Sequence, residues 1–390
     1  MKAKKLINIV LYILFLFAIQ EMALRYLFPL PDIENFDRSI YVNTGDNSSR
    51  PYARHQDWYW ESSVDTTVVF HHDMNGYGFR DKEWKVKKSA NRSRVLFVGD
   101  SFVEGIMAAQ DETIGEGFLT KAGTQQYEVL NAGMLGMGLS EYLQLTADVT
   151  PAFKPDHIFF CIYANDLGEK PPVVPEYFLE PVYYNSYRPR LFEILRQTKK
   201  HGPVPFRWSK SKSLLPACPS PKNPWTSRES ELSPQVKPNL AEAMKAGTFN
   251  PYRVNGILLE EKHLKNPPPL GETLPFLKYI GDKFNAKPVV VYIPSRNQIT
   301  KHYYAFEKES CLQHCHDSLD LTRPAYQIHQ QVLAKACAAV NLPFIDLSAF
   351  IRKQESKGNN LYWDYDEHMK GSGYRAIGGE VWRKWREFRR

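Results

Sequence analysis

Residues 94–105 read RVLFVGDSFVEG, and this stretch decides the fold of the chain. Four apolar residues, 95–98, lead straight into Gly99, Asp100 and Ser101, which is the pattern of a buried strand that ends in a turn. In open parallel sheets, ligands bind beyond the carboxyl ends of the strands. Ser101 is therefore either a nucleophile at a binding site or an ordinary turn residue.

Strand-like and helix-like segments alternate on both sides of this stretch. Further strands are expected at 127–130, 157–163, 288–293 and 343–346, and helices at 113–122, 140–149 and 324–339, with a last amphipathic segment at 376–388. This alternation predicts an α/β fold with three layers, in which helices flank a parallel sheet. The catalytic domain would comprise residues 94–166 and 276–390.

The segment at 167–275 interrupts this alternation and is rich in proline and aromatic residues. We interpret it as a large insertion, which is either a lid over the site or a solvated appendage. Residues 30–93 are polar and aromatic, and we interpret them as an extended collar that leads into the catalytic domain.

The N-terminus has the pattern of an export signal. Lysines at 2, 4 and 5 precede an apolar run at 6–19 that is broken only by Asn8. Signal peptides have apolar cores of this length, but no small-x-small cleavage site follows. We therefore expect residues 1–29 to form an uncleaved signal-anchor, with the catalytic domain on the periplasmic or extracellular side of the membrane. A cleaved signal peptide is the alternative.

The composition is that of an ordinary globular protein, with 390 residues, 43% of them hydrophobic, and a net charge of +7. The basic residues are scattered and form no recognition motif, so nucleic acid is not an expected partner. Cys311 and Cys315, in CLQHCH, are the only close pair of the five cysteines. They suit a local disulfide better than a metal site, because no second CxxC or HxxxH completes the ligand set. With no dinucleotide-binding or P-loop spacing either, we expect neither a metal nor an organic cofactor.

Four short polar motifs belong to one edge of the expected sheet. They are GDS at 99–101, NAGMLGMG at 131–138, YAND at 163–166 and DYDEHMKGSGY at 364–374. The first three directly follow expected strands, and the fourth lies beyond the last strand. Because parallel strands point their carboxyl ends the same way, the four motifs should converge.

Ester chemistry needs the side chains that these motifs carry. The hydroxyl of Ser101 requires a base to remove its proton, and His368 is the candidate. A carboxylate must then hold the imidazole in the right tautomer. Asp366 is the first candidate for that carboxylate, and Asp364 is its rival.

The negative oxygen that forms on an ester under attack needs hydrogen-bond donors already in place. The backbone N–H groups of Ser101 and Gly136 are two candidates. The side-chain amide of Asn165 is a third, since asparagine donates hydrogen bonds without carrying charge.

In this order, the motifs resemble those of the SGNH (GDSL) hydrolase superfamily, named for its serine, glycine, asparagine and histidine. The matching positions are Ser101, Gly136, Asn165 and His368. The sequence NGYGFRDKE at 75–83 also resembles the N-x-x-GFR leader of membrane-anchored bacterial members. The resemblance implies a flavodoxin-like α/β fold and acyl-serine chemistry.

One feature departs from the common family pattern. Many members carry Asp-x-x-His, whereas Tyr365 occupies the position three before His368 here. The Asp-x-His spacing of this chain resembles that of some envelope-associated members, including polysaccharide O-acetyltransferases.

The resemblance implies an ester hydrolase without a cofactor, and the export signal suggests a cell-envelope or extracellular glycan or lipid as its substrate. Removal of an acyl group, for example acetyl, is the expected reaction. Two alternatives remain. One is an O-acetyltransferase that modifies an exported polysaccharide, because the same residues serve both reactions. The other is an inactive envelope protein that binds glycan through the aromatic side chains of the insertion.

Overall fold

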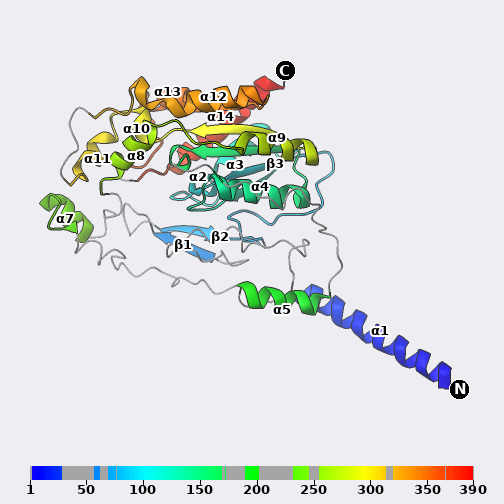
Figure 1. Cartoon of the computed structure of the whole chain (residues 1–390). Helices are drawn as coiled ribbons and strands as arrows, with labels where there is room; N and C mark the ends of the chain where they lie inside the picture. The colour runs from blue at the N-terminus through cyan, green and yellow to red at the C-terminus, as the bar shows by residue number, and fades with distance from the viewer. Residues whose placement is uncertain are drawn as a thin grey trace.

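The core of the protein is a five-stranded parallel sheet (Figure 1). A computed structural model describes residues 2–28, 57–61, 69–75, 77–168, 172, 189–201, 232–245, 254–312, 319–364 and 366–389. The strands lie in the order β4-β3-β5-β6-β7. Their bounds are β3 (Ser93–Gly99), β4 (Tyr127–Gly133), β5 (His157–Tyr163), β6 (Lys287–Ile293) and β7 (Phe344–Asp346). This is the flavodoxin-like order, in which the second strand along the chain lies at the edge. The predicted α/β fold is confirmed.

Helices connect the strands and cover both faces of the sheet. They are α2 (Ser101–Glu104), α3 (Ile114–Ala122), α4 (Leu139–Phe153), the 3₁₀ turn η2 (Ala164–Asp166), α8 (Gly256–Leu264), α9 (Thr273–Phe284), α10 (Arg296–Ile299), α11 (Tyr304–Glu309), the 3₁₀ turn η5 (Pro324–Tyr326), α12 (Ile328–Ala339), α13 (Ser348–Glu355) and α14 (Gly371–Phe388). The last helix begins five residues earlier than the sequence pattern indicates. The expected helix at 324–339 is divided into η5 and α12.

Two successive residues of β5 show how the layers are built, because side chains alternate between the faces of a strand. Phe159 packs against Trp385 of α14 with ring centres 5.6 Å apart. Its neighbour Phe160 packs against Tyr142 of α4 at 5.5 Å. Helices α3 and α14 therefore cover one face together, while α4 and α9 pack together on the other.

Glycines allow α3 and α14 to approach each other closely. A Cβ atom at Gly378 would lie 2.1 Å from the carbonyl oxygen of Ile114. A Cβ atom at Gly117 would lie 2.4 Å from the carbonyl oxygen of Arg375. Both positions therefore require glycine.

The described residues that precede the parallel sheet include two short strands and a segment that packs in the core. Strands β1 (Asp57–Glu61) and β2 (Val69–Asp73) form an antiparallel pair. The Asn75 side chain then organises the following turn by accepting hydrogen bonds from the N–H groups of Tyr77, at 2.9 Å, and Phe79, at 3.1 Å. Phe79 stacks on Trp84 with ring centres 4.6 Å apart. The segment from Asn75 onward thus belongs to the catalytic core.

We interpret residues 167–275 as an insertion that is either a lid or a solvated appendage. Most of this segment lies outside the described residues, and the choice between the two falls there. Its described helices are α5 (Arg190–His201), α7 (Pro238–Lys245) and α8. Ile257 and Leu264 of α8 are buried in the main core. The last part of this segment is therefore integral to the catalytic domain. Cys311 is disulfide-bonded, and Cys315 lies outside the described residues.

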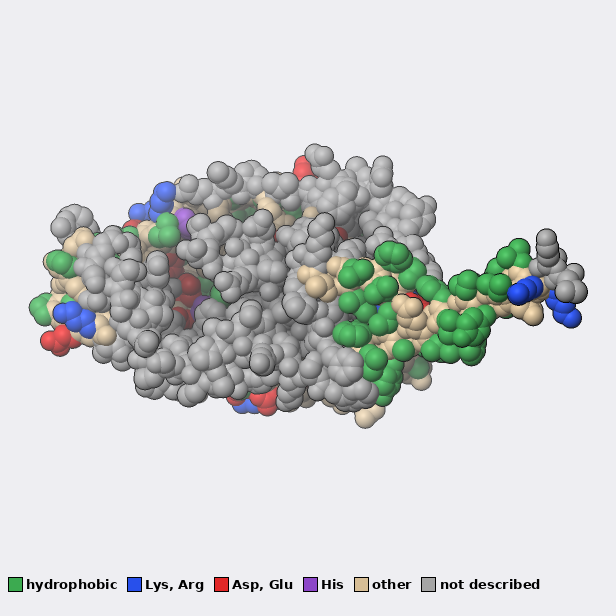
Figure 2. All heavy atoms as spheres, turned by 90° about the horizontal axis from the view of Figure 1, so that it is seen from below, with side chains coloured by type: hydrophobic (Ala, Val, Ile, Leu, Met, Phe, Trp, Pro, Cys, Tyr) green, Lys and Arg blue, Asp and Glu red, His purple; other side chains and the backbone are tan. Residues whose placement is uncertain are grey.

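Helix α1 (Lys2–Leu27) projects from the body of the protein (Figure 1). Its segment Lys4–Leu27 is long and apolar enough to cross a membrane. Hydrophobic side chains cover this helix and the adjoining surface near α5 (Figure 2). Glu21 joins the two helices: its carboxylate pairs with Arg25 and accepts a hydrogen bond, at 2.7 Å, from the backbone N–H of Arg190.

Candidate active site

A sharp turn presents Ser101 at the carboxyl edge of the sheet. Strand β3 ends at Gly99, where a Cβ atom would lie 2.3 Å from the Val103 side chain, so glycine is needed there. The carboxylate of Asp100 then caps α2 by accepting a hydrogen bond from the N–H of Phe102 at 2.9 Å. Ser101 is the first residue of this four-residue helix and is 6% exposed.

His368 meets Ser101 across 267 residues of sequence. Its Nε2 atom lies 2.8 Å from the Ser101 hydroxyl oxygen, and its Nδ1 atom lies 2.5 Å from Oδ1 of Asp366. The same Asp366 oxygen accepts a hydrogen bond from the backbone N–H of His368 at 2.8 Å. Serine, imidazole and carboxylate thus form a continuous chain of hydrogen bonds.

A buried arginine holds the loop that carries His368. The guanidinium of Arg296 is 2% exposed, donates to the carbonyl oxygens of Asp364 and Asp366, both at 2.7 Å, and pairs with Glu307. From the other side, the imidazole stacks on Phe102 of α2 with ring centres 5.3 Å apart. The imidazole is therefore held both from its own loop and from the serine helix.

The two candidate acids have different surroundings. Asp366 is 4% exposed and contacts the imidazole directly. The carboxylate of Asp364 instead lies 3.1 Å from Nε2 of His302, and both of these side chains are more than two-fifths exposed. Of the two, the structure pairs Asp366 with His368.

The electrostatic surroundings favour a protonated imidazole. Burial alone would lower the pKa of His368, but the charge and hydrogen bond of Asp366 outweigh it, and Glu367 and Asp100 add to them. The pKa of His368 is therefore raised. Burial also raises the pKa of Asp100 to about 7.

Gly136 and Asn165 lie at the same edge as Ser101. Gly136 is in the turn after β4, whose last residue, Gly133, is paired with Gly99 of β3. It has φ +77°, a backbone conformation that favours glycine. Asn165 is in η2, directly after β5. No hydrogen bond within the described residues joins Gly136 or Asn165 to Ser101 or His368.

Comparison with known proteins finds similar solved structures, although no family model and no curated protein matches the chain. A member of the lipolytic protein G-D-S-L family from Veillonella parvula DSM 2008 is 12% identical, with a TM-score of 0.36, over 74% of this chain and 96% of that one. A lipase/acylhydrolase from Enterococcus faecalis is 13% identical, with a TM-score of 0.35, over 75% and 96%. A catalytic mutant of Axe2, an acetylxylan esterase from Geobacillus stearothermophilus, is 12% identical, with a TM-score of 0.36, over 76% and 96%.

The chain has a flavodoxin-like α/β fold. The three structures above and two further similar structures are a member of the lipolytic G-D-S-L family, a lipase/acylhydrolase and three esterases. Because the identities are low and all of these TM-scores are below 0.5, we base the functional proposal on the geometry of the site.

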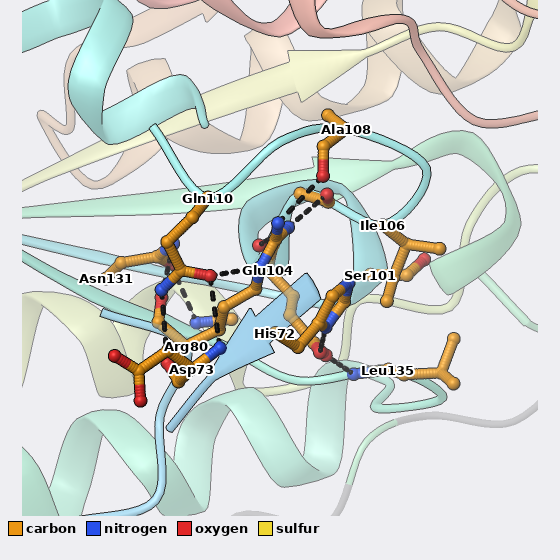
Figure 3. Close-up of polar contacts among 12 residues, drawn as sticks. His72, Asp73, Arg80, Ser101, Glu104, Ile106, Ala108, Gln110, Asn131 and Leu135 are labelled. Carbon is orange, nitrogen blue, oxygen red and sulfur yellow. Dashed lines mark hydrogen bonds and ion pairs between the residues drawn. The ribbon is translucent and has the colours of Figure 1, made fainter. Parts of the chain in front are cut away.

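A buried glutamate connects the serine helix to the glycine turn (Figure 3). Glu104, the last residue of α2, accepts a hydrogen bond from the N–H of Leu135 at 2.6 Å, one residue before Gly136. Its other carboxylate oxygen lies 3.3 Å from Nδ1 of His72. A Cβ atom at Gly133 would lie 2.0 Å from the Glu104 nitrogen, so the two backbones touch. Glu104 thus fixes the Gly136 turn relative to Ser101.

Arg80, from the leader motif, holds the same C-terminal end of α2 (Figure 3). It is 1% exposed and donates to the carbonyl oxygens of Glu104 at 3.2 Å, Gly105 and Ala108 at 2.7 Å. Its Nε atom also donates to the Gln110 side chain at 2.9 Å. The sequence reasoning assigned no role to Glu104 or Arg80. The GFR leader was the only signal that could have drawn attention to the arginine.

A cavity opens beside the loop that carries His368. Asn165 of η2 and Glu367, the residue before His368, lie on one side, and α8 supplies much of the remaining lining, including Glu260. Within the described ranges, no group of three or more His, Cys, Asp or Glu side chains is arranged to hold a metal ion.

Proposed function

We propose that the protein is a serine ester hydrolase that acts through an acyl-serine intermediate. The observation that carries this proposal is the chain of hydrogen bonds from the Ser101 hydroxyl to His368, at 2.8 Å, and on to Asp366, at 2.5 Å. A nucleophile bonded to a base that is itself oriented by a carboxylate is the arrangement that activates a serine.

The reaction proceeds in two halves. Nε2 of His368 takes the proton of Ser101 as Oγ attacks the acyl carbon of the ester. The carbonyl oxygen becomes an oxyanion, which the N–H groups of Ser101 and Gly136 and the amide of Asn165 stabilise. When the tetrahedral intermediate collapses, His368 gives its proton to the departing alcohol, and the acyl group stays on Ser101.

In the second half, His368 takes a proton from water, and the resulting hydroxide attacks the acyl carbon. His368 then returns the proton to Oγ, which releases the acid and restores the serine. Asp366 accepts the Nδ1–H hydrogen bond throughout and stabilises the imidazolium that forms in each half.

The proposed substrate is an acylated, for example acetylated, glycan or lipid of the cell envelope or its exterior. This part of the proposal rests on α1, which we propose anchors the chain with its catalytic domain on the periplasmic or extracellular side. The three lysines at the start of the chain would then remain in the cytoplasm.

The proposal is tested by hydrolysis of p-nitrophenyl acetate with the full chain in detergent. Ser101→Ala should lower kcat by about 10⁴-fold or more, because the members of a triad act as a unit. Ser356→Ala is a control, since that hydroxyl bonds to the carbonyl oxygen of Lys353 on the exposed end of α13. Activity that survives in Ser101→Ala would contradict the proposal. Wild-type protein without turnover or fluorophosphonate labelling would also contradict it and would favour an inactive glycan-binding protein.

The same assay separates hydrolysis from acyl transfer. An acetylated enzyme can pass its acyl group to water or to a sugar hydroxyl, and the triad serves both. We expect acetate to be the main product when an oligosaccharide acceptor is added. An acetylated oligosaccharide formed faster than acetate would instead identify an O-acetyltransferase.

A further inference from the structure

The cavity beside the triad has one polar wall, built around Glu260. It is bounded by Tyr163, Ala164 and Asn165 at the end of β5, by α8, by Ser295 after β6, and by Glu367. Because Asn165 is a proposed oxyanion donor and Glu367 adjoins His368, a group in this cavity would lie next to the ester under attack.

Two buried side chains hold the carboxylate of Glu260 in this wall. The hydroxyl of Ser295 donates to Oε1, and the amide of Asn297 donates to Oε2 at 2.8 Å. Ser295 and Asn297 are 3% and 4% exposed, and Glu260, like Ser295, lines the cavity. A carboxylate oxygen can accept two hydrogen bonds, so each oxygen keeps capacity for one more donor.

The groups around Glu260 indicate which kind of ligand could donate a hydrogen bond to its carboxylate. Burial, opposed by the hydrogen bonds from Ser295 and Asn297, raises the pKa of Glu260 to about 7. Among the described residues, two acids, Glu260 and Glu367, line the cavity against a single histidine, His263, and this balance disfavours an anionic ligand such as a phosphate or a uronate. Leu259, which is 57% exposed, and Leu264 supply apolar lining. A wall with acceptor oxygens beside apolar surface suits a ring that carries hydroxyl groups on one edge and C–H groups on its face.

We propose that this cavity is a subsite for an uncharged sugar ring of the substrate, in which Glu260 accepts a hydrogen bond from a ring hydroxyl. The inference rests on the proposed esterase function and deepens it by assigning a neutral glycan, rather than a lipid or an acidic polymer, as the alcohol part of the substrate. Glu260 sets specificity and takes no part in proton transfer to Ser101.

The test compares an ester that contains a sugar with one that does not. We would measure kcat and KM of the full chain in detergent for a mono-O-acetylated methyl glucoside and for p-nitrophenyl acetate. Glu260→Gln should raise KM for the glucoside up to about tenfold, because an acceptor oxygen is replaced by an amide NH₂ group that cannot accept a hydrogen bond. Its kcat for the glucoside and both constants for p-nitrophenyl acetate should change less than about twofold, as expected when ground-state and transition-state binding are lost equally.

The chain offers a matched control and a second variant. Glu261→Gln changes the neighbouring glutamate, which pairs with Lys265 and Tyr326 and does not line the cavity, so both substrates should be unaffected. Glu260→Gln can keep its own contacts, because Oδ1 of Asn297 has no partner among the described residues and the amide can turn it toward the new side chain. If Glu260→Gln nevertheless fails to fold, Leu259→Arg at the exposed rim fills the cavity instead and should raise KM for the glucoside alone.

The outcomes distinguish the two proposals. Equal losses on both esters in Glu260→Gln, an unchanged KM for the glucoside, or wild-type protein that cleaves p-nitrophenyl acetate but not the glucoside would overturn the subsite while leaving the esterase intact. Wild-type protein that shows no Ser101-dependent turnover of either ester would instead overturn the proposed esterase function.

Discussion

Glu104 offers a direct test of whether the serine helix positions the glycine turn. Its carboxylate is buried and accepts the N–H of Leu135 at 2.6 Å, next to the proposed oxyanion donor Gly136. A hydrogen bond to a charged group contributes about 1.5–3 kcal/mol. One well-placed oxyanion donor contributes about 2.7–4 kcal/mol to the transition state, or roughly 10²–10³ in kcat. Removing the carboxylate should therefore cost both stability and turnover.

The expected effect differs between two substitutions. Glu104→Gln keeps an acceptor oxygen but loses the charge, so its hydrogen bond with the N–H of Leu135 should be weaker. We expect kcat for p-nitrophenyl acetate to fall roughly three- to tenfold. Glu104→Ala releases the turn, so kcat should fall toward the roughly hundredfold loss of a missing donor. KM should change little in Glu104→Gln, because an oxyanion donor acts in the transition state rather than on the bound ester.

Steady-state kinetics and urea unfolding, measured on the same preparations, test whether Glu104 supports turnover as well as stability. Glu141→Gln is the control, because Glu141 accepts the N–H of Gly138 at 3.0 Å, at the other end of the same turn, where it caps α4. It should lose only about 0.3–1 kcal/mol of stability, because the amide oxygen can still accept this N–H and only the negative charge near the start of α4 is lost, with kcat within about twofold of wild type. A Glu104→Gln variant that is destabilised but retains wild-type kcat would refute the reasoning.

Three further predictions concern the triad and the core. Asp366→Asn should lower kcat by about 10⁴-fold, since the imidazole loses the partner that fixes its tautomer, whereas Asp364→Asn should leave the esterase rate unchanged. In a pH–rate profile, kcat/KM should fall as the pH drops through the pKa of His368, which lies above the ordinary value of about 6.5, and a profile centred below that value would contradict the proposed pairing with Asp366. Gly378→Ala should destabilise the fold in urea by about 1–3 kcal/mol or more, because its Cβ meets backbone, while Gly379→Ala, which meets only the flexible Lys121 side chain, should be neutral or stabilising.

The sequence predicted the strands well because each is a short apolar run that ends in a turn. The strand expected at 157–163 is β5, and the strand expected at 343–346 differs from β7 by a single residue. The motif order also predicted that Ser101 and His368 meet, since strand ends in a parallel sheet share an edge. The choice between Asp366 and Asp364 could not be made from spacing, because it depends on how Arg296 holds the loop.

The supporting residues were beyond the reach of sequence patterns. Glu104 and its partner Leu135 are 31 residues apart, and Arg80 reaches carbonyl groups 24 to 28 residues further on. Such contacts depend on the tertiary structure and leave no periodic signal. Glu260 was hidden for another reason: it lies in a segment without clear periodicity, whose last helix proved to be part of the core.

The contacts of Arg80 have a practical consequence for anyone who truncates this protein. A soluble fragment that starts at the first strand of the parallel sheet would omit the guanidinium that ties down the end of the serine helix, and with it the aromatic packing of Phe79 on Trp84. Expression boundaries should therefore fall upstream of Asp57, so that both strands of the antiparallel pair and the arginine are retained together.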